Sequence, residues 1–463
     1  MTQTPKTTTA SSAMLLLVSL GAIGRIFTIA DWTLWCQGFG LIGFLALNFL
    51  AITKMAKALA CLCFALLAFE WLRGDLNAGL AQTALGRAGF MVFFLTALGF
   101  LQHAAGRSPL LLRSGQILLQ QPPGRRYLVL TFGSAMFGML LNLSTIGLLG
   151  TMIRKAADGA TDPETRRIAA IRKERMTLAM LRGFSTIPMW SPITVTIALI
   201  SAAIPGVTWA QLASHSAPLA LAFLLLGWGL DRRSYPRRAG GVPVDAPPLH
   251  RLMPLTLLVI AVPAIAYVIS AVLGTSILVS LLLVLPLMSC GWVYLQERGR
   301  PGAAARTGHE IIGHVLPALP AMRTEATLFG ASAFLGLMIA DVVDTDLLGQ
   351  AISGFGLSGG AVLALTAWMI AALSLVGINQ IVTVTIAAGT LPHLTGLNLS
   401  PVIVGMMLVS VWTVAVNLTP YGTAIRLTGR MVDVPPEVLA HKWNTQFSLV
   451  ALILLSAVLL VLA

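Results

Sequence analysis

Charged residues are scarce in this sequence. Lys, Arg, Asp and Glu together make up 10% of its 463 residues, whereas 57% are hydrophobic. A soluble domain carries about 25% charged residues, so this chain has too few to cover a surface that faces water, and a soluble globular protein is excluded. Apolar runs near the ~20 residues that cross hydrocarbon recur along the chain. Clear examples are Met253–Leu273, Ile277–Val293, Ala361–Val376 and Phe447–Ala463.

Cysteines and catalytic motifs are also few. The four cysteines, Cys36, Cys61, Cys63 and Cys290, all lie in apolar segments. Their spacing fits neither a zinc site nor a disulfide framework, so we interpret them as small hydrophobic residues. The sequence has no phosphate-binding glycine loop, nucleophile elbow or zinc motif. These absences argue against a hydrolase or an ATPase, and we expect a protein that is not an enzyme.

The apolar runs themselves indicate helices. Every backbone amide inside lipid must be paired within the protein, which leaves helices or closed barrels. Because the runs are continuous rather than alternating, they predict an all-α polytopic membrane protein.

The formal net charge of +13 comes from basic residues in short loops between apolar spans. That is the pattern of the positive-inside bias and not of a nucleic-acid-binding protein. It places Arg154–Arg182, the longest polar stretch, together with Asp231–Arg238 and Glu297–Arg323, on the cytoplasmic side. The expected location is therefore the inner (plasma) membrane, with many crossings. Lipid and a small solute are the expected partners, nucleic acid is not, and a homodimer is left open.

A segment rich in Pro and Gly divides the chain. It lies at Pro236–Pro248 and predicts a linker, residues 236–250, between a first membrane half at 1–235 and a second at 251–463. We therefore compared the two halves for an internal repeat.

Each half contains a hydroxyl residue followed by Pro within an apolar span. Ser191-Pro192 in the first half and Thr419-Pro420 in the second are related by a shift of 228 positions, which also pairs Ser185 with Thr413. Proline removes a helical hydrogen bond, and lipid-facing backbone does not tolerate the loss. A break of this kind exposes N–H groups that attract anions and carbonyl groups that hold cations. Two such breaks at matched positions are the best sequence indication of a secondary-transporter site, although a single one is more often a simple kink.

An Asn-containing segment precedes each break. The first reads Asn142-Leu143-Ser144-Thr145, and the second reads Asn379-Gln380-Ile381-Val382-Thr383. Both place an Asn followed by hydroxyl residues inside apolar sequence.

This pattern resembles the ion transporter superfamily, which includes divalent anion/sodium symporters and arsenite-efflux permeases. The resemblance implies two inverted-topology repeats, each with a re-entrant hairpin and a discontinuous helix, whose tips and breaks meet around substrate and sodium. Neither tip reads Ser-Asn-Thr, as the family's tips do. No organic cofactor is implied; sodium is the one ion, held at the same residues as the substrate. The implied binding residues are Asn142, Ser144 and Thr145 at one tip, Asn379, Gln380 and Thr383 at the other, Ser191, Pro192 and Thr194 at the first break, and Thr419, Pro420, Gly422 and Thr423 at the second.

The sequence therefore favours a secondary active transporter that moves a small, anionic solute by coupling to a sodium or proton gradient. The alternative is a membrane-embedded glycan polymerase or another lipid-linked transferase. A cavity at the two Pro breaks favours the transporter, and a catalytic groove at the outer interface favours the enzyme. Such enzymes usually need a large external loop with a catalytic Arg or His, and no long external loop is evident in the sequence.

Overall fold

The chain is helical throughout the part that the computed structural model describes. The described residues are 5–28, 30–74, 76–158, 162–235, 246–342 and 345–462. No strand occurs among them, and eight segments among them are long and apolar enough to cross a membrane. The prediction of an all-α polytopic membrane protein is confirmed. Residues 236–245 of the predicted linker lie outside the described residues.

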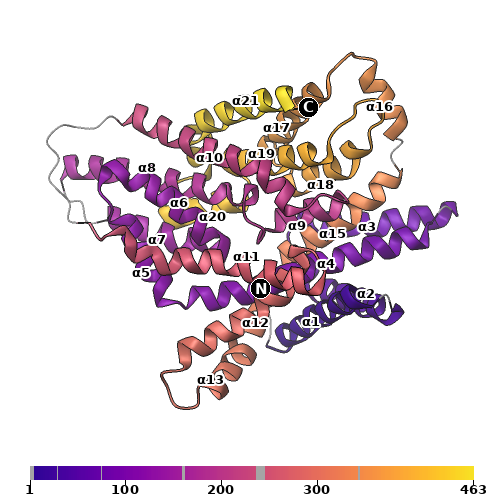
Figure 1. The fold of residues 1–463 in the computed structure, drawn as a ribbon, viewed down its shortest axis with the longest axis horizontal. Coiled ribbons are helices and arrows are strands. Elements are labelled where there is room, and N and C mark those ends of the chain that lie inside the picture. Colours follow the sequence, from indigo (N-terminus) through magenta and orange to yellow (C-terminus); the bar gives the residue numbers. More distant parts are fainter. Residues whose placement is uncertain are drawn as a thin grey trace.

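Five helices precede the first repeat-like segment. The first two form an antiparallel hairpin, and the long α4 runs beside it and contacts α12 and α15 from the second half of the sequence (Figure 1). These five helices are α1 (Pro5–Phe27), α2 (Asp31–Asn48), α3 (Lys54–Arg73), α4 (Ala78–Gly106) and α5 (Pro109–Leu119).

A helical hairpin and a broken helix follow. The elements are α6 (Pro123–Leu141), α7 (Ser144–Ala157), α8 (Pro163–Ser185), the 3-10 helix η1 (Ile187–Met189), α9 (Val195–Ala203) and α10 (Trp209–Ser234). The polar stretch Arg154–Arg182 is largely helical. It forms the end of α7 and most of α8, and α8 is buried from Met176 to Ser185. Sequence composition hid the burial because the exposed first half of α8 carries most of its charges.

The middle of the chain forms two helices that are long and apolar enough to cross a membrane, and a projecting segment follows them. Its elements are η2 (Leu249–Leu252), α11 (Met253–Leu273), α12 (Ile277–Glu297), α13 (Ala303–Glu310), the π-helical η3 (Ile311–Val315), α14 (Leu316–Ala318), η4 (Leu319–Met322), α15 (Arg323–Val342) and α16 (Thr345–Ser353). Glu310 ties α13 to the end of α4, because its carboxylate lies 2.7 Å from Nε2 of His103 and 2.8 Å from Nη1 of Arg107. Burial acts to raise the pKa of Glu310, but these two partners outweigh it and hold the pKa below its usual value.

The last third repeats the pattern of hairpin, broken helix and single helix. Its elements are α17 (Gly359–Leu375), α18 (Gln380–Thr390), η5 (Leu391–His393), α19 (Pro401–Leu418), α20 (Thr423–Val432), the π-helical η6 (Val438–Trp443) and α21 (Thr445–Leu462). The run Ala361–Val376 forms α17, which is shorter than the eight candidate spans and ends at a turn from which α18 runs back. Hydropathy does not distinguish a helix that crosses from one that turns back.

Helix α19 is the core of the molecule and lies near the centre of Figure 1. Every residue from Ile403 to Leu418 is buried, as expected for a helix that is apolar on all sides. It packs against α8, α10, α17 and α21. Next to α19, helices α6 and α8 pack closely at Gly183 of α8. A Cβ at this position would lie 2.1 Å from the carbonyl oxygen of Thr131 on α6. Hairpin and broken helix are thus in backbone contact in the first half.

Candidate functional site

The first break lies between α8 and α9, as the Ser-Pro pair predicts. Helix α8 ends at Ser185, η1 follows, and regular helix resumes only at Val195. Oγ of Ser191 accepts a hydrogen bond from the backbone N–H of Ile193 (3.3 Å), and Oγ1 of Thr194 accepts one from the N–H of Ile197 (3.4 Å). The hydroxyl groups therefore replace part of the backbone hydrogen bonding that Pro192 interrupts.

The second break has the same local construction. Helix α19 ends at Leu418 and α20 begins at Thr423. Oγ1 of Thr419 accepts a hydrogen bond from the N–H of Tyr421 (3.2 Å), across Pro420. In both breaks, then, the hydroxyl residue before Pro closes a turn onto the residue after Pro. The helix interruptions predicted at Pro192 and Pro420 are both present.

Asparagine forms both hairpin tips. Asn142 ends α6 with a φ of 49° and a ψ of −132°, a backbone conformation that only Gly adopts without strain and that Asn tolerates better than most residues. At the other tip, Gly377 has a φ of 90°, and Oδ1 of Asn379 caps α18 by accepting from the N–H of Ile381 (2.9 Å). The two Asn residues thus shape the turns, which is a structural role in addition to the predicted one in binding.

Each hairpin contacts the broken helix of the other half. Helix α7 of the first hairpin packs along α20, and α18 of the second hairpin packs along α9. A Cβ on Gly150 of α7 would lie 2.7 Å from Cβ of Met431 on α20. Helices α7 and α20 are therefore in close contact at Gly150 and Met431.

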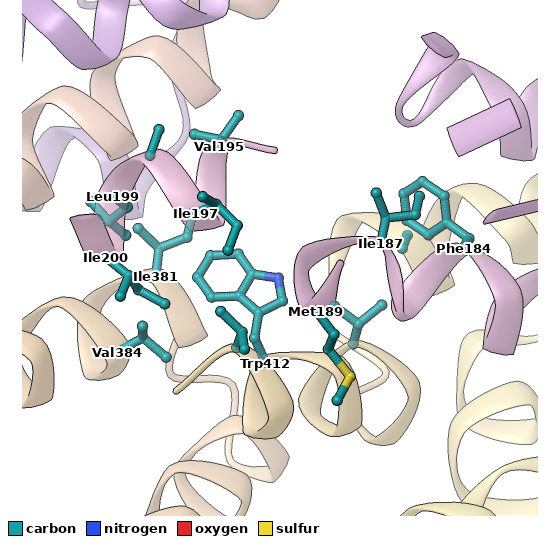
Figure 2. Packing of buried hydrophobic residues seen from close by; sticks show 14 of the residues in the cluster. Phe184, Ile187, Met189, Val195, Ile197, Leu199, Ile200, Ile381, Val384 and Trp412 are labelled. Atoms are coloured by element: carbon teal, nitrogen blue, oxygen red, sulfur yellow. The ribbon is translucent and has the colours of Figure 1, made fainter. Parts of the chain in front are cut away.

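The second pair, α9 and α18, meets in the apolar core. Figure 2 shows Ile197 and Ile200 of α9 on the same side of Trp412 as Ile381 and Val384 of α18, with Met189 of η1 on the other side. All of these residues are buried. Near Trp412, the apolar side chains of both halves therefore form one continuous core.

Two hydrogen bonds join the helices that lead into the breaks. Oγ1 of Thr413 donates to the carbonyl oxygen of Ser185 (2.9 Å), and Nδ2 of Asn417 donates to Oγ of Ser185 (2.7 Å). Ser185 and Thr413 are the residues that the 228-position shift pairs. Contact between equivalent residues is expected where a pseudo-twofold axis passes between two repeats.

The thirteen residues predicted to bind a ligand differ in exposure. Thr145, Ser191, Pro192, Thr419 and Pro420 are buried; Asn142, Thr194, Asn379, Gln380, Thr383 and Gly422 are half-buried; Ser144 and Thr423 are exposed. Oγ1 of Thr145 has no hydrogen-bond partner among the described residues. Gly422 supplies no side-chain cap to α20, so the first-turn N–H groups of α20 lack a side-chain acceptor.

A cavity of about 780 Å³ lies beyond the first break, and none of the thirteen residues lines it. Three residues of α9, Ala198, Ser201 and Ala202, form part of its wall. Arg25 of α1 and Arg87 of α4 also line it. Sequence reasoning missed this cavity because its walls come from segments far apart in the chain.

Arg182 was also missed, since its position at the end of a polar stretch suggested a loop. It is 4% exposed. Its guanidinium donates to Oδ1 of Asn444 (3.1 Å), the hydroxyl of Tyr127 (3.0 Å) and the carbonyl oxygen of Gly227 (3.3 Å), and it lies over the ring of Phe447. A buried cation with neutral partners joins α6, α8, α10 and the start of α21 in this way.

Comparison with solved structures relates this arrangement to known proteins. The YdaH transporter of Alcanivorax borkumensis, whose topology is unusual, aligns over 87% of this chain and 97% of its own, with a TM-score of 0.55 and 15% identity. MtrF of Neisseria gonorrhoeae, of a class of antimetabolite efflux pumps, aligns over 82% of both chains, with a TM-score of 0.52 and 14% identity. The chain has the fold of these two proteins. No protein-family model matches it, and no curated protein matches it in sequence.

Proposed function

We propose that the chain is a secondary active transporter of the inner membrane that carries a small anionic solute, driven by a sodium or proton gradient. It shares its fold with one transporter and one efflux pump. The observation that carries the proposal is the crosswise packing of α7 on α20 and of α18 on α9. This packing joins both hairpins and both broken helices into one unit of the kind found at transporter sites.

The charge distribution supports an inverted relation between the halves. The open end of the first hairpin carries Arg125, Arg126, Arg154 and Lys155, whereas the second hairpin has no Lys or Arg at its open end, around Gly359 and Thr390. By the positive-inside bias, the first hairpin enters from the cytoplasmic side and the second from outside. Membership of the ion transporter superfamily and a homodimer remain predictions.

The tips and breaks supply suitable groups for an anion. Helices α7 and α20 pack along each other, and helix N-termini attract negative charge. Ser144 and Thr423, the first residues of these helices, are exposed and leave access to the N–H groups behind them. The oxygen of Thr145 and the carbonyl groups of the breaks are the type of ligand that a hard cation such as sodium prefers.

The rival, a lipid-linked transferase, predicts catalytic groups in a groove at the outer interface. The 780 Å³ cavity does border the segment Gly206–Trp209, which contains no Lys or Arg. Among the described residues, its lining contains Arg25 and Arg87 but no Asp, Glu, His or Cys. A general base is needed to activate the attacking hydroxyl of a glycan acceptor, so this lining does not support the transferase.

Transport into proteoliposomes tests the proposal. The purified protein is supplied with labelled succinate, citrate, benzoate, sulfate and phosphate under an imposed sodium or proton gradient. We expect uptake of at least one of these anions, and loss of that uptake when the Asn142 side chain is deleted. Asn142→Gly is the suitable variant, because Gly keeps the positive φ that Ala would strain.

Asn398 offers a matched control. It has a φ of 46° and lies in the loop between η5 and α19, where its side chain is exposed. Asn398→Gly should transport like the wild type. Equal uptake by Asn142→Gly, or no gradient-driven movement of any of the five anions, would contradict the proposal.

A further inference from the structure

The 780 Å³ cavity is separate from the tips and breaks and has a chemistry of its own. Its walls come from the α1–α2 hairpin, α4, α9, the start of α10 and the turn between α11 and α12. Its volume falls in the range of about 300–1,000 Å³ that is typical of small-molecule pockets, which are mostly apolar with a few convergent polar groups.

Two arginines give the cavity its charge. Arg25 and Arg87 both line it, and neither forms an ion pair or a hydrogen bond with any described residue. Arg25 lies against Gly86 of α4, where a Cβ would be 3.0 Å from its Nε. No carboxylate of the described residues lines the cavity. Both guanidinium groups carry positive charge in a largely apolar wall, a setting that favours a bound anion.

A buried amide adds a neutral polar group. Gln37 of α2 lines the cavity and is 1% exposed, and its Oε1 has no hydrogen-bond partner among the described residues. Oγ of Ser201 is likewise buried and without a partner there. Buried polar groups without partners cost free energy, so their presence in the wall of a cavity indicates a ligand that satisfies them.

Aromatic side chains complete the wall and connect it to the first break. Phe90, Trp209 and Tyr267 line the cavity. Nε1–H of Trp209 donates to the carbonyl oxygen of Trp190 (3.1 Å), the residue that directly precedes Ser191-Pro192. A ligand in contact with Trp209 therefore touches a residue that is hydrogen-bonded to the segment of the first break.

We propose that this cavity binds an organic oxyanion with an apolar body, its carboxylate or phosphate held by Arg25 and Arg87 and its hydrogen-bond donor facing Gln37. The proposal does not depend on transport. The oxyanion has two sources, a soluble solute or the headgroup of an anionic lipid.

Benzoate and its neutral analogue benzamide test the charge requirement. In thermal-shift titrations of the purified protein, benzoate should raise the melting temperature and benzamide should not. Arg25→Gln and Arg87→Gln should each weaken benzoate binding at least tenfold, because Gln keeps hydrogen bonding but loses the charge. Arg113→Gln removes an exposed arginine of α5 and should bind benzoate normally.

Further measurements keep the test decisive. Arg25→Lys and Arg87→Lys keep the charge and should retain more affinity than the Gln variants, which excludes misfolding as the cause of a loss. Uptake of succinate, citrate, sulfate and phosphate is measured alongside in Arg25→Gln and Arg87→Gln, so failure of the transport proposal is distinguishable from failure of this one. Equal shifts with benzoate and benzamide, or unchanged binding in both Gln variants, would overturn the proposal.

Lipid nanodiscs identify the source of the oxyanion. Equal benzoate affinity in phosphatidylcholine and phosphatidylglycerol nanodiscs supports a soluble ligand. Affinity that is present in phosphatidylcholine and at least tenfold weaker in phosphatidylglycerol supports a lipid headgroup that competes for the same arginines. Absence of benzoate binding in both nanodiscs and in detergent overturns the site.

Discussion

The hydrogen bond from Asn417 to Ser185 should measurably couple the two halves of the protein. Both residues are at most 2% exposed, and the N···O distance is 2.7 Å. Interhelical hydrogen bonds in membrane proteins average about 0.6 kcal/mol, with a maximum near 1.7 kcal/mol. Because this bond is short and fully buried, we expect a coupling free energy of about 0.5–1.5 kcal/mol in the cycle of Ser185→Ala, Asn417→Leu and the double variant.

The cycle is measured as the free energy of unfolding in mixed micelles titrated with sodium dodecyl sulfate. Ser185→Ala alone should destabilise by about 1–3 kcal/mol, since it leaves a buried N–H of Asn417 without its acceptor. Ser410 is the control, because its hydroxyl is equally buried but, among the described residues, bonds only to Met406 of its own helix. Ser410→Ala and Ser185→Ala should be additive to within about 0.3–0.5 kcal/mol. A Ser185–Asn417 coupling below about 0.3 kcal/mol would refute the reasoning.

Three further predictions follow from the other contacts. Pro192→Ala and Pro420→Ala should each abolish gradient-driven anion uptake while the protein stays monodisperse, because restored helix fills the break; normal uptake in both would argue that the breaks are only kinks. Tyr127→Phe removes one acceptor of the buried guanidinium of Arg182 and should lower the free energy of unfolding by about 1.5–3 kcal/mol, and a loss below 0.5 kcal/mol in the same micelle titration would contradict this role. Glu310 has a lowered pKa in the folded state, so its contribution to stability is present above its unfolded pKa of about 4.3 and is lost as the pH falls through the lower folded value. Melting temperatures between pH 6 and pH 3 should therefore fall less steeply for Glu310→Gln than for the wild type, and parallel curves would count against the ion pair.

The breaks and tips could be located from the sequence because their chemistry is local. Pro192 and Pro420 cannot continue a helix wherever they lie. Asn142 and Asn379 suit the turn of a hairpin by their own backbone and side-chain preferences. Each of these signals is complete within a few residues, so no knowledge of tertiary contacts was needed.

The arginine cavity and the buried Arg182 could not be found in this way. Arg25, Gln37, Arg87 and Ser201 lie on four different helices, and no spacing in the chain relates them. An arginine in an apolar run is ordinarily interpreted as one whose charge reaches the membrane surface. Only the packing of α1 and α2 on α4 shows that these polar groups converge.

The crosswise packing of the hairpins also affects how the protein is made. Helix α7 has 14 residues and α18 has 11, which at 1.5 Å per residue gives ~21 Å and ~17 Å, less than the ~30 Å hydrocarbon core. Neither helix can settle alone as a crossing segment. Helix α7 packs against α5, α6 and α8 of its own half, but its contact with α20 can form only when the end of the chain has been made. At ~5–20 residues per second, ribosomes need tens of seconds to reach α20 after completing α7. During that interval the face of α7 that later packs on α20 is exposed to the cell's membrane chaperones and proteases, and a chain that ends before α20 leaves this face uncovered permanently.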